Sequence, residues 1–327
     1  MRLYFATPRY DSAATMIQGY ACGISNVLLS YANVQEKRGG FGFWIESRRE
    51  HMKLYVAGNG KSKGSAQRDH DTGTRNRLLS YAFLKDWAKD EFEFWIDRRP
   101  QDVSVFLDSG AFSAHTLGRH IDLQEYCDYV KANRDALDAY AVLDVIGNLD
   151  ATLRNLRYMR DQGLDPVAIY HAGREPVEVL RDTLEDHTGY VALGGMASER
   201  ITREELRAKL DACWHVIERF WPVKVHGLGI MAQWALERYP WYSVDSSSAI
   251  VAAGMGRVTR YEGGQMVSRG WLEDVAATWD GLVADGVGRT EGKSKSAHEG
   301  RRVRNITAQL RLERYVTDLW TARGVSW

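Results

Sequence analysis

The segment VSVFLDSGAF occupies residues 103–112 and places an aspartate, Asp108, at the end of a short apolar run. The same arrangement occurs in AYAVLD, which ends at Asp144, and in WYSVD, which ends at Asp245. A run of this length without polar alternation is typical of a strand buried on both faces. An aspartate at the carboxyl end of such a strand would lie on the rim where a parallel α/β barrel gathers its active-site loops. The three runs therefore predict a parallel sheet with acidic groups along one edge.

Five further apolar runs complete a set of eight. In chain order the eight are RLYFAT (2–7), KLYVAG (53–58), VSVFLD (103–108), AYAVLD (139–144), PVAIYH (166–171), YVALGG (190–195), VKVHGLG (223–229) and WYSVD (241–245). Amphipathic segments lie between them; two are expected to begin at Asp122 and Asp150, and Thr202 with Glu205 forms a capping box before a third. Strands that alternate with helices predict an α/β fold, a (β/α)8 TIM barrel. The amphipathic segment 306–320 predicts a C-terminal helical extension.

An internal repeat lies near the start of the chain. The blocks MRLYFA, LLSYA and GFWIESRR start at positions 1, 28 and 42 and return as MKLYVA, LLSYA and EFWIDRR at positions 52, 78 and 93, an offset of about 51 residues. Three blocks that keep one spacing indicate that 1–50 and 52–99 are duplicated βα units. We expect a catalytic barrel over 1–285, with its eighth helix over 268–285, and a basic loop and helix packed on the barrel over 286–327.

Composition narrows the class of protein. The chain has 327 residues, enough for one large barrel, and its 43 basic residues balance 43 acidic ones. Any contact with nucleic acid must then come from local patches. Cys22, Cys127 and Cys213 are isolated and form no C-x-x-C, so neither a disulfide framework nor a thiolate zinc site is predicted. No apolar run approaches the length of a membrane span, so we expect a soluble cytoplasmic protein without a membrane partner.

Taken in chain order, the strand ends resemble the tRNA-guanine transglycosylase superfamily. The family's D-S-G-[GA]-F stretch matches Asp108 to Phe112, its tyrosine strand ending in Gly-Gly-[LM] matches YVALGGM (190–196), and its G-x-G strand followed by an aspartate matches Gly227 to Asp245. The matches span roughly residues 50–250. They look most like the phage-encoded branch, which exchanges guanine in DNA for a 7-deazaguanine. The C-x-C-x-x-C zinc motif of the tRNA enzymes does not follow Asp245 here.

The resemblance implies roles for the three aspartates. Exchange of a nucleobase breaks an N-glycosidic bond, and a carboxylate can trap the anomeric carbon as a covalent intermediate. Asp245 would be this nucleophile. Asp108 would be the general acid that protonates departing guanine, and then the base that deprotonates the incoming deazaguanine. Asp144 would accept the N1–H and the 2-amino group of guanine.

The resemblance also implies the rest of the substrate site and the class of enzyme. The further substrate-binding residues are Ser109, Gly110, Phe112, His171, Gly194, Gly195, Met196, His226 and Gly227. The enzyme would be a pentosyltransferase that inserts a base of the preQ0 or preQ1 type. It would need no cofactor and no metal ion.

DNA is the implied polynucleotide, with tRNA as the alternative and the free 7-deazaguanine base as second substrate. A phage-encoded enzyme would act in the host cytoplasm. Two glycine-, serine- and charge-rich stretches, 58–77 and 286–305, are predicted to be loops that contact phosphates. The basic residues expected to make these contacts are Lys61, Lys63, Arg68, Arg75, Arg77, Lys293, Lys295, Arg301, Arg302 and Arg304. An aromatic side chain near the rim, Phe112, Trp241 or Tyr242, is expected to stack when the target guanosine leaves the helix.

Other interpretations of these residues stay open. A strand-end aspartate commonly caps the following helix, and Gly110 or the pair Gly194–Gly195 can serve tight turns. His226 can be a core residue that bonds to its neighbours. A metal-dependent amidohydrolase barrel, with His171, His226 and Asp245 as ligands, is a second class of function, but the first two predicted strands lack its H-x-H pair. A non-catalytic protein that binds nucleic acid is a third class.

Overall fold

The computed structural model describes residues 6–8, 14–16, 51–58, 63–84, 89–100, 102–186, 189–196, 201–270, 273–274 and 295–326. Residue contacts divide the chain into two compact units. Unit 1 comprises Met1–Lys53, Tyr170–Val244 and Glu313–Trp327. Unit 2 comprises Leu54–Ile169 and Asp245–Leu312.

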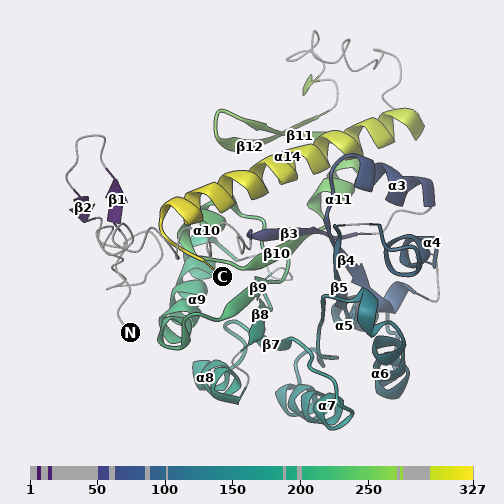
Figure 1. Cartoon of the computed structure of the whole chain (residues 1–327), viewed down its shortest axis with the longest axis vertical. Helices are drawn as coiled ribbons and strands as arrows, with labels where there is room; N and C mark the ends of the chain where they lie inside the picture. Colours follow the sequence, from purple (N-terminus) through teal and green to yellow (C-terminus); the bar gives the residue numbers. More distant parts are fainter. Residues whose placement is uncertain are drawn as a thin grey trace, which may run out of the picture. The chain divides into compact units, whose positions relative to one another are not determined.

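Eight parallel strands form the main sheet (Figure 1). They are β3 (Lys53–Val56), β4 (Asn76–Ser80), β5 (Ser104–Asp108), β6 (Ala139–Tyr140), β7 (Ala168–His171), β8 (Tyr190–Gly194), β9 (Lys224–Gly227) and β10 (Ser243–Ser246). Their order is β6-β5-β4-β3-β10-β9-β8-β7, and a parallel bridge joins Ala141, just beyond β6, to Val167, just before β7. The first barrel strand in the chain, β3, therefore pairs with the last, β10, and the bridge joins the two ends of the strand order. Helices alternate with the strands along the chain. This is the (β/α)8 TIM-barrel fold that the sequence predicts.

The first two barrel strands differ from the prediction. The run 2–7 is predicted to be strand one, but its described part lies in β1 (Ala6–Pro8), which pairs antiparallel with β2 (Ala14–Met16) in a separate sheet. The barrel begins instead at β3. Its second strand, β4, starts inside the stretch 58–77 that is predicted to be a loop. The described residues ahead of β4 form helix α3 (Lys63–Asp71).

Unit 2 contains several further helices and helical turns between its strands. They are the 3₁₀ turn η1 (Tyr81–Phe83), α4 (Lys89–Phe92), the π-helical turn η2 (Glu93–Asp97), α5 (Ala111–Thr116), α6 (Leu123–Ala132), η3 (Arg134–Ala136), α7 (Leu149–Asp161) and α11 (Ser248–Gly254). Asp122 caps α6 as predicted, because its side chain accepts the N–H of Glu125 at 2.8 Å. Asn148, not Asp150, caps α7, and its side chain accepts the N–H of Ala151 at 3.0 Å.

Unit 1 holds α8 (Val177–Asp186), α9 (Arg203–Ile217), η4 (Glu218–Phe220) and α10 (Gln233–Arg238). The predicted capping box of Thr202 and Glu205 is confirmed at the start of α9. An aromatic cluster fills the core of this unit. The ring of Trp214 stacks on Tyr239 with centroids 5.7 Å apart and meets Trp241 edge-on at 5.3 Å.

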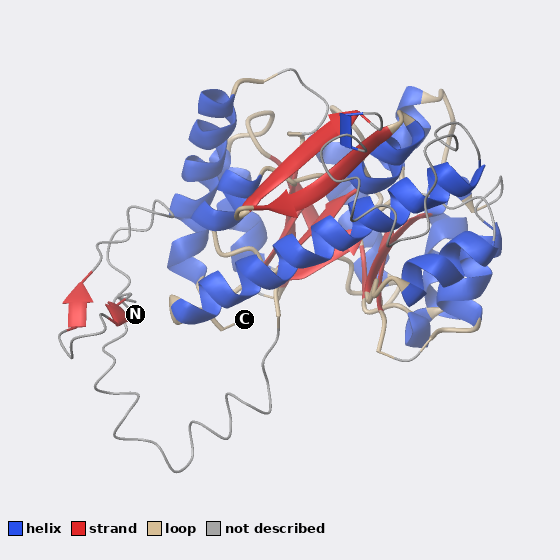
Figure 2. Ribbon diagram, turned by 90° about the horizontal axis from the view of Figure 1, so that it is seen from above, coloured by secondary structure: helices blue, strands red, loops and turns tan. Residues whose placement is uncertain are grey.

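The chain after β10 adds a hairpin and a long helix. The hairpin pairs β11 (Arg257–Glu262) with β12 (Gln265–Gly270), and in Figure 2 it lies beside the long helix α14 (Lys295–Ala322). Residues 268–270, expected to begin the eighth barrel helix, are part of β12, and 275–285 fall outside the described residues. The predicted C-terminal helix is present and begins earlier than 306. Its Ile306 packs with Val56 and Ala249 in unit 2.

Cys127 and Cys213 are buried free thiols, and Cys22 lies outside the described residues. None of the described helices combines the length and the apolar character needed to span a membrane.

Candidate active site

The three strand-end aspartates all belong to unit 2. Asp108 is the last residue of β5 and lies opposite Ser80 in the register of β4 with β5. Asp144 follows the short strand β6 and is 8% exposed. Asp245 lies on β10 and is half-buried. The carboxyl end of each strand therefore delivers one acidic side chain, as the sequence predicts.

Asp108 has the most perturbed carboxyl of the three. Its pKa rises from 3.8 to about 7, chiefly because burial removes water and further because the charges of Asp144 and Asp245 repel its negative form. The N–H of Gly110 donates to Oδ2 of Asp108 at 3.0 Å and opposes part of this rise. Repulsion of this kind requires neighbouring charges, so the three carboxyl groups lie close enough to interact. A carboxyl with a pKa near neutrality can donate a proton in one step and accept one in the next.

Ser109 connects the loop after Asp108 to the carboxylate of Asp144 through a hydrogen bond. It is fully buried, and its hydroxyl donates to Oδ1 of Asp144 at 3.3 Å while accepting the N–H of Ala111, also at 3.3 Å. The sequence predicts Ser109 as a substrate-binding residue, whereas in this structure its hydroxyl contacts a carboxylate of the same site.

The helix-capping interpretation fits only one of the aspartates, and there in part. Asp108 accepts the N–H two residues ahead, which is a local turn bond. The cap of α7 is Asn148 rather than Asp144, and the cap residue of α11 is Ser247 rather than Asp245. Two of the three carboxylates therefore stand at strand ends without capping the helix that follows.

Gly110 is required by the turn itself. Its φ is +76°, in the left-handed region, and a Cβ there would lie 2.4 Å from Oγ of Ser80 and 2.5 Å from Cβ of Ala82. The turn interpretation of this glycine is thus confirmed. Ser80 is not among the predicted site residues, because none of the eight predicted strands covers β4. Its hydroxyl is buried and forms no hydrogen bond within the described part of the chain.

Tyr126 is a second residue that the sequence analysis missed. Its side chain is fully buried, and its hydroxyl donates to the carbonyl of Ala141 at 2.8 Å. Burial raises its pKa well above the ordinary value, and the charges of Asp108 and Asp144 add to the rise. A tyrosine on the apolar face of an amphipathic helix is predicted to be a core residue. Only the folded structure shows that Tyr126 lies near the carboxylates of Asp108 and Asp144.

The other predicted substrate-binding residues on β7, β8 and β9 all lie in unit 1. His171 ends β7. Its backbone N–H donates to Oε2 of Glu175 at 3.1 Å, and its ring Nδ1 forms a hydrogen bond of 2.9 Å with Oε1 of the same residue. Gly194 ends β8, and Gly195 has a φ of +80° with its Cα facing His171, so that a Cβ would lie 3.2 Å from Cβ of that histidine. This packing explains Gly195 as a turn residue. Met196 is buried.

His226 and Gly227 are core positions of β9. His226 is fully buried and its Nδ1 shares a hydrogen bond of 2.6 Å with Oγ of Ser243, which also contacts the hydroxyl of Tyr190 at 2.6 Å. This is the arrangement that the core interpretation of His226 describes. A Cβ on Gly227 would lie 3.0 Å from both Ile230 and Trp241.

The aromatic side chains expected to stack on a displaced base differ in exposure. Trp241 is fully buried and donates from Nε1 to the carbonyl of Ala235 at 3.1 Å, and Tyr242 is 5% exposed. Both are core residues, so the expectation that they stack at the rim is wrong. Phe112, the second residue of α5, is 54% exposed and lies four positions after Asp108.

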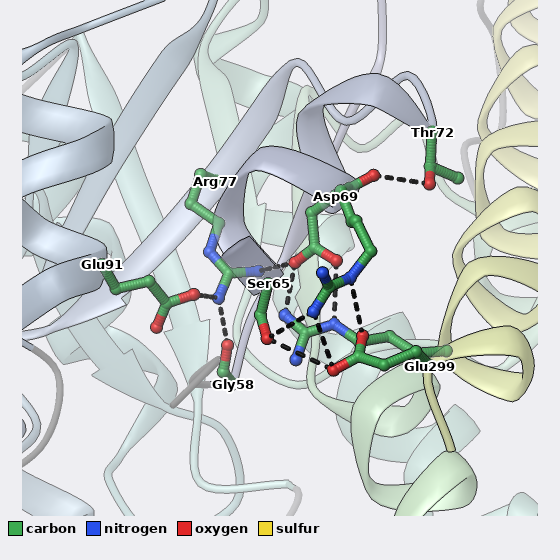
Figure 3. Close-up of polar contacts among 9 residues, drawn as sticks. Gly58, Ser65, Asp69, Thr72, Arg77, Glu91 and Glu299 are labelled. Atoms are coloured by element: carbon green, nitrogen blue, oxygen red, sulfur yellow. Dashed lines mark hydrogen bonds and ion pairs between the residues drawn. The ribbon is translucent and has the colours of Figure 1, made fainter. Parts of the chain in front are cut away.

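Several basic residues predicted to contact DNA are internal instead, and Figure 3 shows Arg77 between its two carboxylate partners. Arg77 lies on β4, is fully buried, and pairs with Glu91 and with Asp69. Arg302 donates from Nε to Asp69 at 2.8 Å. Arg301, also buried, donates from Nε to the carbonyl of Ala253 at 3.0 Å. These three predictions are wrong, because the guanidinium groups stabilise the interior and do not face a phosphate.

The remaining basic residues vary. Arg68 is 43% exposed and pairs with Glu299 at 3.1 Å, and Arg75 is exposed and donates to the carbonyl of His70 at 2.9 Å. Lys63 and Lys295 begin α3 and α14, and Arg304 is half-buried on α14. Lys61 and Lys293 lie outside the described residues. Across the described ranges, no group of three or more His, Cys, Asp or Glu side chains is arranged to hold a metal ion.

No protein-family profile matches the sequence, and no curated protein matches it. Among solved structures, the chain is similar to a mutant tryptophan synthase α-subunit from Pyrococcus furiosus, with 13% identity, a TM-score of 0.47, and coverage of 80% of this chain and 98% of that one. It is also similar to a dipeptide epimerase from Enterococcus faecalis, with 9% identity, a TM-score of 0.41, and coverage of 62% and 57%. Similarity at this level defines neither a family nor an activity.

Proposed function

We propose that the protein is a base-exchange transglycosylase that replaces guanine in DNA with a 7-deazaguanine. The observation that carries the proposal is the group of three strand-end carboxylates in which Asp108 has a pKa of about 7. Such a group offers a carboxylate nucleophile and a proton carrier side by side, which glycosyl transfer requires. The ordered resemblance of the strand ends to guanine transglycosylases supports the same chemistry.

In the proposed first step, a carboxylate oxygen of Asp245 attacks C1′ of the target nucleoside. The C1′–N9 bond breaks, its electron pair leaves with guanine, and protonated Asp108 gives its proton to the departing base. In the second step, the Asp108 carboxylate takes the N9 proton of the incoming 7-deazaguanine. N9 then attacks C1′ and displaces Asp245, so that the enzyme returns to its starting protonation state.

Asp144 would recognise guanine in both steps. An ionised carboxylate accepts the N1–H and the 2-amino group together, an arrangement that adenine does not offer. The hydroxyl of Ser109, which donates to Oδ1, would hold the carboxylate in place. The exposed ring of Phe112 is available to the substrate beside Asp108.

The test incubates the protein with DNA or tRNA that carries radiolabelled guanine, together with preQ0, and follows loss of label from the polymer. We expect loss from DNA only in the presence of the deazaguanine. Release from tRNA alone would keep the chemistry and move the substrate to RNA. Retention of label in both polymers would contradict the proposal.

Replacement of the nucleophile provides a sharper check. Asp245→Ala should abolish exchange while leaving DNA affinity nearly unchanged, because the carboxylate forms the covalent bond and contributes little to binding. Asp150→Ala, an exposed aspartate in the first turn of α7, is the matched control and should behave as wild type. Near-normal turnover by Asp245→Ala would remove it as the nucleophile.

A further inference from the structure

The segment that carries Asp144 leaves the sheet early. The sequence predicts a strand over 139–144, but ladder pairing to β5 covers only Ala139 and Tyr140, with one further bridge from Ala141 to Val167. Asp108, by contrast, is still inside the ladder of β5, opposite Ser80. The two carboxylates are therefore held by different means, and Asp144 lies beyond the last bridge of its strand.

Beyond the last bridge of this strand, side chains form hydrogen bonds with its backbone groups. The hydroxyl of Tyr126 donates to the carbonyl of Ala141 at 2.8 Å. Nδ2 of Asn155 donates to the carbonyl of Leu143 at 2.7 Å, and the N–H of Val145 donates to Oγ1 of Thr152 at 2.9 Å. The backbone groups immediately before and after Asp144 are thus bound by two residues of one helix, α7. Buried backbone groups need such partners, and here side chains supply them.

Helix α7 is itself well fixed at this end. Asn148 caps it, and the hydroxyl of Thr152 donates back to the carbonyl of Asn148 at 3.2 Å. Thr152 is 2% exposed, so its hydroxyl does not exchange partners with solvent. A clamp of this kind transmits the position of a rigid helix to the carboxylate between its two contact points.

We propose that Thr152 and Asn155 are positioning residues that set the place of the Asp144 carboxylate and thereby its selectivity for guanine. The selectivity part rests on the proposed function, because Asp144 is there the reader of the base edge. Neither Thr152 nor Asn155 is among the residues predicted to bind the substrate. Their loss should weaken recognition of the 2-amino group while leaving the proton transfer by Asp108 intact.

The test compares oligonucleotides with guanine or hypoxanthine at the target position, since hypoxanthine lacks the 2-amino group. For Asn155→Ala we expect the ratio of kcat/KM for guanine over hypoxanthine to fall by about tenfold, because a displacement on the order of 1 Å can cost up to a hundredfold. Asp144→Asn gives the ratio expected when recognition of the 2-amino group is lost completely. Asp150→Ala is the matched control, because it changes an exposed residue of the same helix that makes no contact with the clamp. It should leave the ratio unchanged.

A second pair of variants separates the hydroxyl from helix stability. Thr152→Ser keeps the hydroxyl and should retain the wild-type ratio, whereas Thr152→Val keeps the volume, loses the acceptor for Val145, and should lower the ratio. Equal ratios in the two variants, or an unchanged ratio in Asn155→Ala, would overturn the inference. Crystal structures of Asn155→Ala and wild type decide it independently of activity. If wild type shows no exchange, the proposed function fails, while an unmoved Asp144 in Asn155→Ala would overturn the clamp.

Discussion

At the scale of single residues, the environment of Asp108 favours the neutral carboxylic acid. Burial removes the water that would solvate the charge, and Asp144 and Asp245 repel it. In the unfolded chain these effects are absent and the carboxyl ionises at its ordinary pKa. The native state therefore holds a proton that the unfolded state has released throughout the range between pH 4 and pH 7. The stability that the neutral carboxyl contributes is therefore full below about pH 4 and is lost as the pH rises towards the native pKa of about 7.

Replacement of this carboxyl should show the effect directly. Asp108→Asn removes the charge and keeps an oxygen for the N–H of Gly110. Its free energy of unfolding relative to wild type should increase by roughly 2–3 kcal/mol between pH 5 and pH 8, since one pKa unit corresponds to about 1.4 kcal/mol. Denaturant unfolding at the two pH values measures the difference. A difference that does not vary with pH would show that the pKa of Asp108 is not raised.

The positions of the three aspartates could be predicted from the sequence, because a strand end is a local pattern. The perturbed pKa of Asp108 could not, because it arises from side chains far apart in the chain. The burial of Trp241 likewise depends on Trp214, which packs against it from α9. A tryptophan next to a strand looks the same in sequence whether it faces the core or the rim.

At the scale of elements, α3 shows how a polar segment can form a structured part of the molecule. The sequence KGSAQRDHD has no continuous apolar face, and the stretch 58–77 is predicted to be a loop because it is rich in glycine, serine and charged residues. Its attachment comes instead from ion pairs. Asp69 is 1% exposed and contacts Arg77 of β4 (Figure 3). It also accepts a hydrogen bond from Arg302 of α14. Such long-range pairs leave no local signal. A signal for β4 did exist, since LLSYA occurs in both copies of the repeat.

The role of Asp69 can be measured against a neighbour on the same helix. Asp69→Ala should reduce the free energy of unfolding by about 3–5 kcal/mol, because it leaves two buried guanidinium groups without their shared carboxylate. Asp71→Ala, whose carboxylate is 63% exposed, should change it by less than about 0.5 kcal/mol. Equal effects in denaturant unfolding would contradict the structural role of Asp69.

At the scale of the whole molecule, helix α14 contributes to the core of both units. In unit 2, Asn305 donates from Nδ2 to the carbonyl of Ala249 at 2.9 Å and accepts the N–H of Thr259 at 2.6 Å. In unit 1, Trp320 is fully buried and donates from Nε1 to the carbonyl of Leu236 at 2.8 Å. The extension after the barrel is therefore part of the folded core of each unit.

A truncation tests this contribution. A chain that stops after residue 294 loses the buried side chains of Ile306, Leu312, Val316 and Trp320. At about 1.5–3 kcal/mol each, their loss approaches the whole stability of a typical protein, so the cooperative unfolding transition should disappear. Truncation after Ala322, which ends α14, should retain the transition with a lower midpoint. Near-ultraviolet circular dichroism during heating distinguishes the two, and a wild-type melting curve for the shorter chain would contradict the expectation.

The ion pairs of Asp69 with Arg77 and Arg302 have a consequence for warming. Hydration of charged groups becomes less favourable as temperature rises, so the penalty for keeping them away from water shrinks. Apolar contacts such as those of Ile306 gain no comparable advantage. The junction of α3, β4 and α14 should therefore be among the last parts of unit 2 to loosen in a hot cell.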